Sequence, residues 1–212
     1  MPNKNIEDKI REGRSYRPME VRVAQEEGEE YIVEGYATTF NQPYTLYSEP
    51  GYVFQEVVDS KAFDKTDMED VILQYNHEGR VFARKSNGTL KLTVDDHGLK
   101  VRADLSGTEI GRQLYEEIRG GYTTKMSFGF TVEADKLEKS ETEDLMTVTR
   151  TITGIKKLYD CSAVSLPAND TTAIYARNYC EGVIAEVKEE IRLANERRAR
   201  REALLKEIME EN

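Results

Sequence analysis

A succession of short segments rich in β-branched and aromatic residues most constrains the fold of this 212-residue chain. EYIVEGYATTF over residues 30–40 comes first, and YVFQEVV over residues 52–58 follows a turn-rich stretch. VILQYN, RVFARK, TLKLTVD and LKVRADL come next, each of six or seven residues. Segments of this kind, separated by turn residues, are typical of β-strands. We therefore expect a mainly β fold.

Longer segments continue the pattern in the second half, and two helices interrupt it. YTTKMSFGFTVEA begins at residue 122 and LMTVTRTITGIKKLYDCSAVSLPAN at residue 145, with a charged loop expected over 135–144. One helix is expected over 59–70, where Asp59 and Ser60 are candidate N-caps. Another is expected over 107–121, where two glycines end it. The predicted class is α+β, mainly β: an antiparallel β-barrel or half-barrel surrounded by a few helices.

Composition separates the two ends from this middle part. We expect a polar N-terminal arm over residues 1–18, a β-barrel domain over 19–178 and a charged C-terminal helix over 179–212. In the last segment Arg198 and Arg201 interrupt the apolar seam that a sustained coiled coil needs. A solvated helix with charge pairs four residues apart and a helix that binds a partner both fit the pattern.

Charge and cysteine content exclude several classes of function. A formal net charge of −10 argues against sequence-independent binding to nucleic acid or to an anionic membrane, because both need a cationic surface. Cys161 and Cys180 are too few for a disulfide framework or a four-ligand zinc site, so we expect an intracellular protein without metal or cofactor. We also expect no transmembrane segment and no secretion signal, since no apolar run approaches the roughly 20 residues that span a bilayer.

Ser127 is the first candidate for chemistry. In KMSFGFTV the residues Met126, Phe128 and Phe130 alternate with Lys125, Ser127 and Gly129, and side chains alternate between the two faces of a strand. Ser127 therefore emerges from a rigid strand, on the face opposite to the apolar side chains. Such a position suits a nucleophile, but it also suits a serine that merely occupies the polar face.

Two histidines are available as a base, and they differ in context. His77 follows the apolar segment VILQYN, where we expect Glu78 and Gly79 to turn the chain. An imidazole there is suited to general-base catalysis, and a serine hydroxyl needs such a base. His97 lies in DDHG, a hairpin turn in which Gly98 would adopt a positive φ, and we assign it a structural role.

Asp160 is the candidate for a third catalytic group. It interrupts the otherwise apolar strand KKLYDCSAV, and a buried carboxylate needs a partner. A histidine would be that partner in a catalytic site, where the acid orients the imidazole. Lys156 or Lys157 would be the partner in a purely structural arrangement. Neighbouring Cys161 lies on the opposite face of the strand, so we expect it in the core.

These residues occur within a recognisable series of motifs. The series consists of EGYATTFNQPY, an AFD segment, a histidine after VILQYN, a serine in MSFGF, and LYDCSAVSLPAN. In this order and spacing, from about Val33 to Asn178, the chain resembles the prohead maturation proteases of tailed bacteriophages. The resemblance implies a serine endopeptidase related in fold to the herpesvirus assemblins.

The resemblance also implies roles, a substrate and a location. The catalytic histidine of the family corresponds to His77, its serine to Ser127, and the acid of its L-x-E-x-S segment, usually glutamate, to Asp160. The implied substrate is the scaffolding protein, or the scaffolding segment of the major capsid protein, inside the prohead in the host cytoplasm. Such proteases also cut themselves, so the arm and the C-terminal helix would be docking or removable segments. Whether copies of the chain associate stays open.

Three alternatives compete with this interpretation. The chain would be a non-catalytic scaffold or docking protein of capsid assembly, a barrel that binds a small molecule, or a serine protease whose base is Lys125. The donors that stabilise an oxyanion are not evident from the sequence, although backbone amides near Ser127 or the Arg150 guanidinium are candidates.

Overall fold

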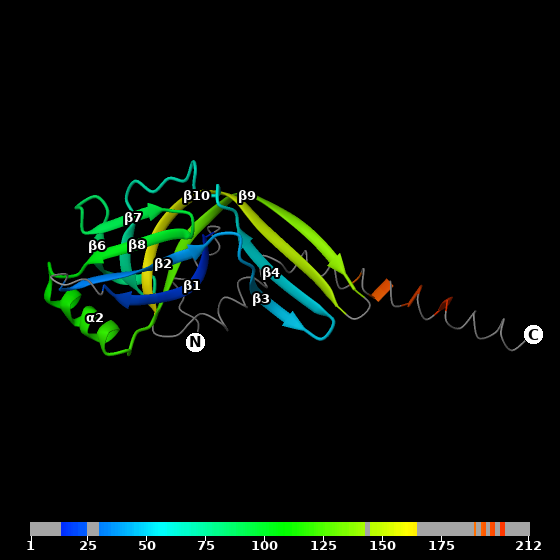
Figure 1. Ribbon diagram of the computed structural model, residues 1–212, viewed down its shortest axis with the longest axis horizontal. Helices are drawn as coiled ribbons and strands as arrows, with labels where there is room; N and C mark the ends of the chain where they lie inside the picture. The colour runs from blue at the N-terminus through cyan, green and yellow to red at the C-terminus, as the bar shows by residue number, and fades with distance from the viewer. Residues whose placement is uncertain are drawn as a thin grey trace, which may run out of the picture. The chain divides into compact units, whose positions relative to one another are not determined.

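The computed structural model describes residues 14–24, 30–142 and 145–164, together with seven positions between 189 and 201. The chain divides into two compact units, residues 1–173 and 174–212. The described part of the first unit contains ten strands and one helix (Figure 1): β1 Arg14–Val23, β2 Ile32–Thr39, β3 Tyr44–Glu49, β4 Tyr52–Val58, β5 Ile72–Tyr75, β6 Glu78–Arg84, β7 Leu90–Val94, β8 Gly98–Asp104, α2 Glu109–Arg119, β9 Lys125–Glu141 and β10 Met146–Val164. The mainly β prediction is confirmed.

All ten described strands join one network of hydrogen bonds, in the order β3-β4-β10-β9-β1-β2-β8-β7, with β5 and β6 branching from β10. The path starts at β3 and ends at β7, and no pairing between these two described strands closes it. The predicted closed barrel is therefore wrong. The sheet is also mixed rather than antiparallel, because β10 pairs in parallel with β4 and with β5.

Strand β10 is the central strand of this network. It is 19 residues long and pairs with different strands along its length. One edge pairs with β4 from Met146 to Ile152 and with β5 from Asp160 to Ala163. The other edge pairs with β9 over almost its entire length. A single long strand thereby brings the end of β5, which leads into His77, next to the part of β9 that carries Ser127.

Two sequence-based assignments around the sheet are wrong. The charged segment expected as a loop over 135–144 belongs to β9 as far as Glu141, because its backbone pairs with β10 while its side chains stay exposed. The helix expected over 59–70 is a series of turns, in which the amides of Ala62 and Asp64 donate to carbonyls three residues earlier. Strand β3 was not expected. Its sequence, YTLYSE, lies within a stretch that reads as turns.

The helix expected over 107–121 is confirmed as α2, and both of its ends are capped. The Thr108 hydroxyl accepts a hydrogen bond from the Gly111 amide, which satisfies one of the free donors of the first turn. At the other end the Gly120 amide donates to the Glu116 carbonyl, and Gly121 has a φ of 73°. Leu114, Tyr115 and Ile118 of the helix are buried.

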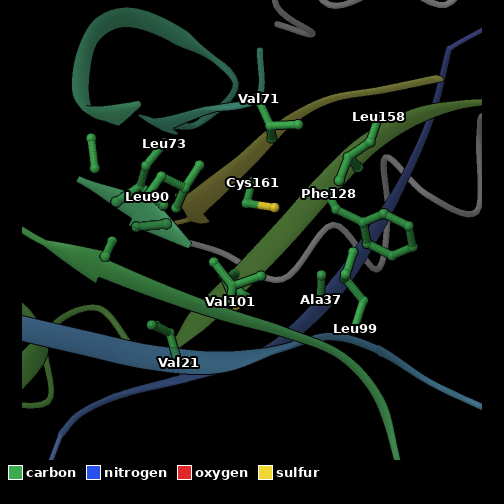
Figure 2. Close-up of a cluster of buried hydrophobic side chains, with 14 of the residues drawn as sticks. Val21, Ala37, Val71, Leu73, Leu90, Leu99, Val101, Phe128, Leu158 and Cys161 are labelled. Carbon is green, nitrogen blue, oxygen red and sulfur yellow. The ribbon is translucent and has the colours of Figure 1, made fainter. Parts of the chain in front are cut away.

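The hydrophobic core lies on one side of the β9–β10 pair (Figure 2). Phe128 of β9, with Leu158 and Cys161 of β10, packs there against Leu99 and other apolar side chains. The expected core position of Cys161 agrees with this packing. Since side chains alternate along a strand, the other face of β9 carries Ser127.

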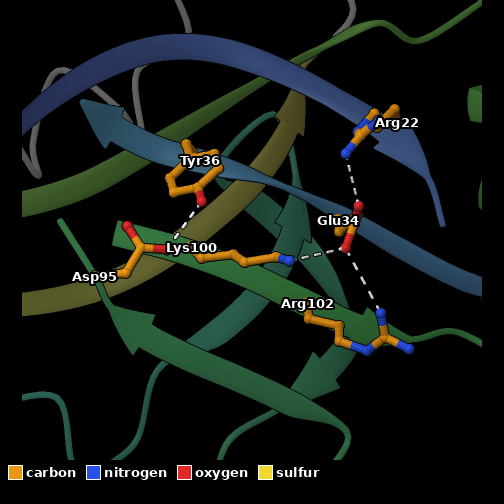
Figure 3. Close-up of polar contacts among 6 residues, drawn as sticks. All are labelled: Arg22, Glu34, Tyr36, Asp95, Lys100 and Arg102. Carbon is orange, nitrogen blue, oxygen red and sulfur yellow. Dashed lines mark hydrogen bonds and ion pairs between the residues drawn. The ribbon is translucent and has the colours of Figure 1, made fainter. Parts of the chain in front are cut away.

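The outer face of β1, β2 and β8 carries polar contacts (Figure 3). Glu34 pairs with Arg22 at 2.9 Å, Lys100 at 3.3 Å and Arg102 at 3.6 Å. The Tyr36 hydroxyl donates to Asp95 at the β7–β8 turn. Asp95 also accepts hydrogen bonds from the amides of His97 and Gly98. His97 is exposed, so its predicted position in the turn is confirmed.

Gly98 is required for a reason other than the one expected. The residue does not adopt a positive φ. A Cβ atom at this position would instead lie 2.0 Å from the Thr38 carbonyl oxygen of β2.

Only part of the expected three-segment organisation can be compared with the described residues. Residues 14–18 of the expected arm lie in β1, whereas residues 1–13 and the boundary near residue 178 lie outside the described part. In the second unit the seven described positions are helical, and Arg192 pairs with Glu189 and Glu196. No helix among the described residues is long and apolar enough to cross a membrane.

Candidate catalytic site

His77 lies at the tip of the β5–β6 hairpin. Tyr75 pairs with Glu78 across the hairpin, so the two turn residues are Asn76 and His77, with φ values of 51° and 61°. Two consecutive positive φ values are what a tight hairpin turn of the type I′ kind requires. The turn therefore precedes the position that the sequence suggested, Glu78 and Gly79. A histidine in this conformation costs about 1–3 kcal/mol and is found chiefly where function or packing demands it.

The imidazole of His77 contacts the carboxylate of Asp160. The distance from His77 Nδ1 to Asp160 Oδ1 is 2.5 Å, and the two side chains are 6% and 3% exposed. The Asn76 amide also donates to the Ala163 carbonyl at 2.9 Å, which fixes the hairpin against β10. Burial of a carboxylate is tolerated when it is paired, and the partner here is the histidine.

A local irregularity of β10 helps to place Asp160. The register between β9 and β10 shifts between Leu158 and Asp160, and bulges of this kind redirect side chains. The lysines considered as structural partners lie elsewhere: Lys156 is exposed and Lys157 pairs with Asp67 at 2.7 Å. The partner of the Asp160 carboxylate is therefore His77 and neither of these lysines.

Ser162, which corresponds to the serine of the L-x-E-x-S segment, is a member of the site to which the sequence analysis gave no role. Its hydroxyl donates to Asp160 Oδ1 at 2.8 Å, the same oxygen that contacts His77, and the residue is fully buried. The available signal was the spacing D-x-S, because residues two apart share one face of a strand.

Ser127 lies one strand away, on the same face of the sheet. It is directly opposite Ser162 in the β9–β10 ladder, so the Cα atoms of Ser127 and Asp160 form a diagonal pair about 7–8 Å apart. The Ser127 hydroxyl is buried and makes no hydrogen bond to any group of the described residues, His77 included. The structure thus joins His77 to Asp160, and Ser127 lies on the neighbouring strand without a hydrogen bond to either of them.

Burial is the common feature of these side chains. The residues His77, Ser127, Asp160 and Ser162 are each at most 5% exposed. A polar cluster of this kind can orient an imidazole and exclude water. Ser127 is 1% exposed, so the alternative in which it merely occupies the solvated face of a strand does not hold.

Other candidate groups lie outside this cluster. Arg150, considered as an oxyanion donor, precedes Ser162 by twelve positions in β10, roughly 40 Å along a straight strand, and pairs with Glu56 and Asp135. Burial and the neighbouring Asp160 raise the pKa of Cys161, so its thiol is a poor nucleophile. Within the described part of the chain no group of three or more His, Cys, Asp or Glu side chains is arranged to hold a metal ion.

A cleft of about 430 Å³ lies beside the His77 turn. Its apolar part is formed by Tyr75, Phe82, Ile110 and Leu114, and its polar part by Asn76, Glu78, Arg80, Gln113 and Glu117. These residues come from the β5–β6 hairpin and from α2. The volume is in the range of pockets that hold small ligands or peptide side chains.

The comparison with protein families agrees with the motifs. The family model described as caudovirus prohead serine protease matches residues 17–184. Among solved structures, the bacteriophage T4 capsid assembly protease is similar at 12% identity, with a TM-score of 0.38, over 73% of this chain and 99% of the other. No curated protein matches the chain.

Proposed function

The chain belongs to the family of caudovirus prohead serine proteases, and from that premise we propose that it is a serine endopeptidase with Ser127 as nucleophile and His77 as base. Its substrate is the scaffolding protein, or the scaffolding segment of the major capsid protein, and the enzyme also cleaves itself. It acts within the immature capsid in the host cytoplasm. The observation that carries the proposal is the buried contact between His77 Nδ1 and Asp160 Oδ1.

This contact fixes what each nitrogen of the ring does. Asp160 accepts a hydrogen bond from Nδ1–H, so the proton of the neutral ring stays on Nδ1 and Nε2 keeps the lone pair that a general base needs. Nε2 takes the proton of Ser127 as the hydroxyl oxygen attacks the peptide carbonyl. The same proton then passes to the leaving amine, and water hydrolyses the acyl-enzyme by the reverse sequence of proton transfers.

The buried site implies a step before catalysis. In the structure His77 and Ser127 do not form a hydrogen bond, and the Ser127 hydroxyl has no access to a peptide. Catalytic contacts are often incomplete without substrate and tighten when it binds. The site therefore opens first, and the substrate chain then brings the hydroxyl and the imidazole together. The cleft beside the His77 turn receives side chains near the bond that is cut.

Co-expression with the capsid and scaffolding proteins tests the proposal. We expect cleavage by the wild-type chain and none by Ser127→Ala or His77→Gln, while both variants remain folded by circular dichroism. Thr131→Ala is the matched control, since it removes a buried hydroxyl four residues along the same face of β9. Normal processing by a folded Ser127→Ala variant would exclude the proposal.

The alternatives give different outcomes. A docking protein without chemistry would support assembly equally well as wild type or His77→Gln, with no cleavage in either case. A serine–lysine protease would lose cleavage in Lys125→Met and keep it in His77→Gln. A protein that only binds a small molecule would not react with a serine-directed fluorophosphonate and would cleave nothing.

A further inference from the structure

A second serine, Ser162, is built into the cluster that holds His77 and Asp160. Its side chain is fully buried, and its hydroxyl donates to Asp160 Oδ1 at 2.8 Å. This is the oxygen that the His77 ring contacts at 2.5 Å. A single carboxylate oxygen therefore accepts from two buried donors on different segments of the chain.

The geometry points to Ser162 as the residue that positions the catalytic carboxylate. The role rests on the proposed function, since it acts on the reaction through Asp160. An aspartate carboxylate turns easily about the bond that joins it to Cβ. A second donor, held on the same strand two residues away, selects the orientation in which Oδ1 faces Nδ1 of the imidazole. Hydrogen bonds to a charged acceptor are about twice as strong as neutral ones.

The fold explains why this donor comes from position 162. Residues 160 and 162 share one face of β10, and the register shift next to Asp160 moves its side chain relative to the ladder. The backbone of β10 is held there on both edges, by β9 and by β5. The hydroxyl therefore sits on a rigid base, whereas His77 is at the tip of a hairpin.

Ser162 is also directly opposite Ser127. Opposite residues of an antiparallel pair have Cβ atoms about 4.5–5.5 Å apart, so any side chain at position 162 borders the nucleophile. A serine supplies the donor and occupies little space. The two hydroxyls differ in their bonds: that of Ser162 is committed to Asp160, whereas that of Ser127 makes no hydrogen bond among the described groups.

Three variants separate positioning from packing. Ser162→Ala removes the donor, Ser162→Thr retains it with one extra methyl group, and Thr38→Val removes another buried strand hydroxyl, 2% exposed, that lies on β2. In Ser162→Ala we expect kcat for a peptide that spans a mapped cleavage site to fall about tenfold, the size of one lost hydrogen bond to a charged group. We expect KM to stay unchanged, Ser162→Thr to restore most of kcat, and Thr38→Val to keep it.

Proton NMR of the full chain tests the same point without catalysis. The chain has two histidines, and a His77→Gln variant assigns the signal of the His77 Nδ1 proton. In the wild type and in Ser162→Thr we expect a resolved, slowly exchanging signal, and in Ser162→Ala a signal broadened by exchange with water. Thr38→Val should resemble the wild type.

The outcomes for Ser162 and for the protease are distinguishable. An unchanged signal and unchanged kcat in folded Ser162→Ala, or no resolved signal in the wild type, would overturn the positioning role and leave proteolysis by Ser127 intact. Absence of cleavage by the wild type, combined with the expected NMR changes, would instead overturn the proposed function and leave the Ser162 contact intact.

Discussion

Replacing Arg150 by methionine should destabilise the fold strongly, because Arg150 lies at the centre of a buried ionic cluster. Its side chain is 3% exposed, and Nη1 lies 3.1 Å from Oε2 of Glu56, whose side chain is completely buried. Its Nε also donates to Asp135, which is 30% exposed. Methionine preserves most of the volume but removes the positive charge, so the Glu56 carboxylate remains buried without its cation. Breaking a buried pair in this way costs about 3–5 kcal/mol.

Thermal unfolding followed by circular dichroism measures the effect. For a chain of this length 1 kcal/mol corresponds to about 2–4 °C, so Tm should fall by roughly 6–20 °C in Arg150→Met. Arg84→Met is the matched control: it breaks an ion pair with Asp70 whose side chains are 46% and 41% exposed, and exposed pairs contribute little. The double variant Arg150→Met/Glu56→Leu should recover most of the loss. Equal changes in Tm for Arg150→Met and Arg84→Met would refute the reasoning.

Four further changes test other parts of the structure. Asp160→Asn should lower the rate of cleavage about 10³–10⁴-fold while the fold persists, as expected when the orienting charge is removed; kinetics on purified variants measure it, and a decrease below tenfold would contradict the role of the acid. Gly98→Ala should lower Tm in thermal unfolding, because its Cβ would lie 2.0 Å from the Thr38 carbonyl oxygen. Gly88→Ala is the control: its Cβ would have no atom within 4 Å, so any fall in Tm there measures only the strain of a φ of 80°. Cys161 should resist alkylation in the native chain at any pH that preserves the fold, since burial raises the pKa of its thiol. Mass spectrometry of the peptide that contains it gives the extent, and rapid native labelling would contradict its position in the core. Phe82→Ala should raise KM about tenfold with kcat unchanged if the cleft beside the His77 turn receives a substrate side chain; unchanged KM and kcat would contradict that role of the cleft.

The sequence predicted correctly the strands and helices that are marked by residues close together in the chain. YVFQEVV became β4 with the boundaries expected, because every second residue is buried. The two terminal glycines similarly marked the C-terminal end of α2. These signals depend on side-chain periodicity and on the hydrogen bonds at helix ends, which the sequence displays directly.

The strand segments that the sequence analysis missed are stabilised by pairing with strands that are distant in the sequence. Residues 135–141 are strongly charged, yet they form part of β9 because the backbone of β10 lies beside them. β3 likewise exists through its pairing with β4, despite the turn residues around it. Propensity is weaker than pairing in such positions, so composition alone misassigned both segments.

In the candidate site, too, features of one segment were predictable, whereas contacts between segments were not. The interruption of an apolar strand by Asp160 predicted a buried acid with a partner, and the contact with His77 has that form. The positive φ of His77 depends on the turn that β5 and β6 impose. The burial of Ser127 and the bond from Ser162 depend on the β9–β10 register, which no single segment reveals.

The central claim is most directly tested by identifying the residue that a serine-directed fluorophosphonate modifies in a preparation that is actively cleaving capsid protein. We predict covalent modification of Ser127, found by peptide mass spectrometry, with cleavage stopping in proportion to the modified fraction. His77→Gln should abolish the modification, because the hydroxyl then has no base. Modification of a different serine, or continued cleavage when Ser127 is fully modified, would contradict the account.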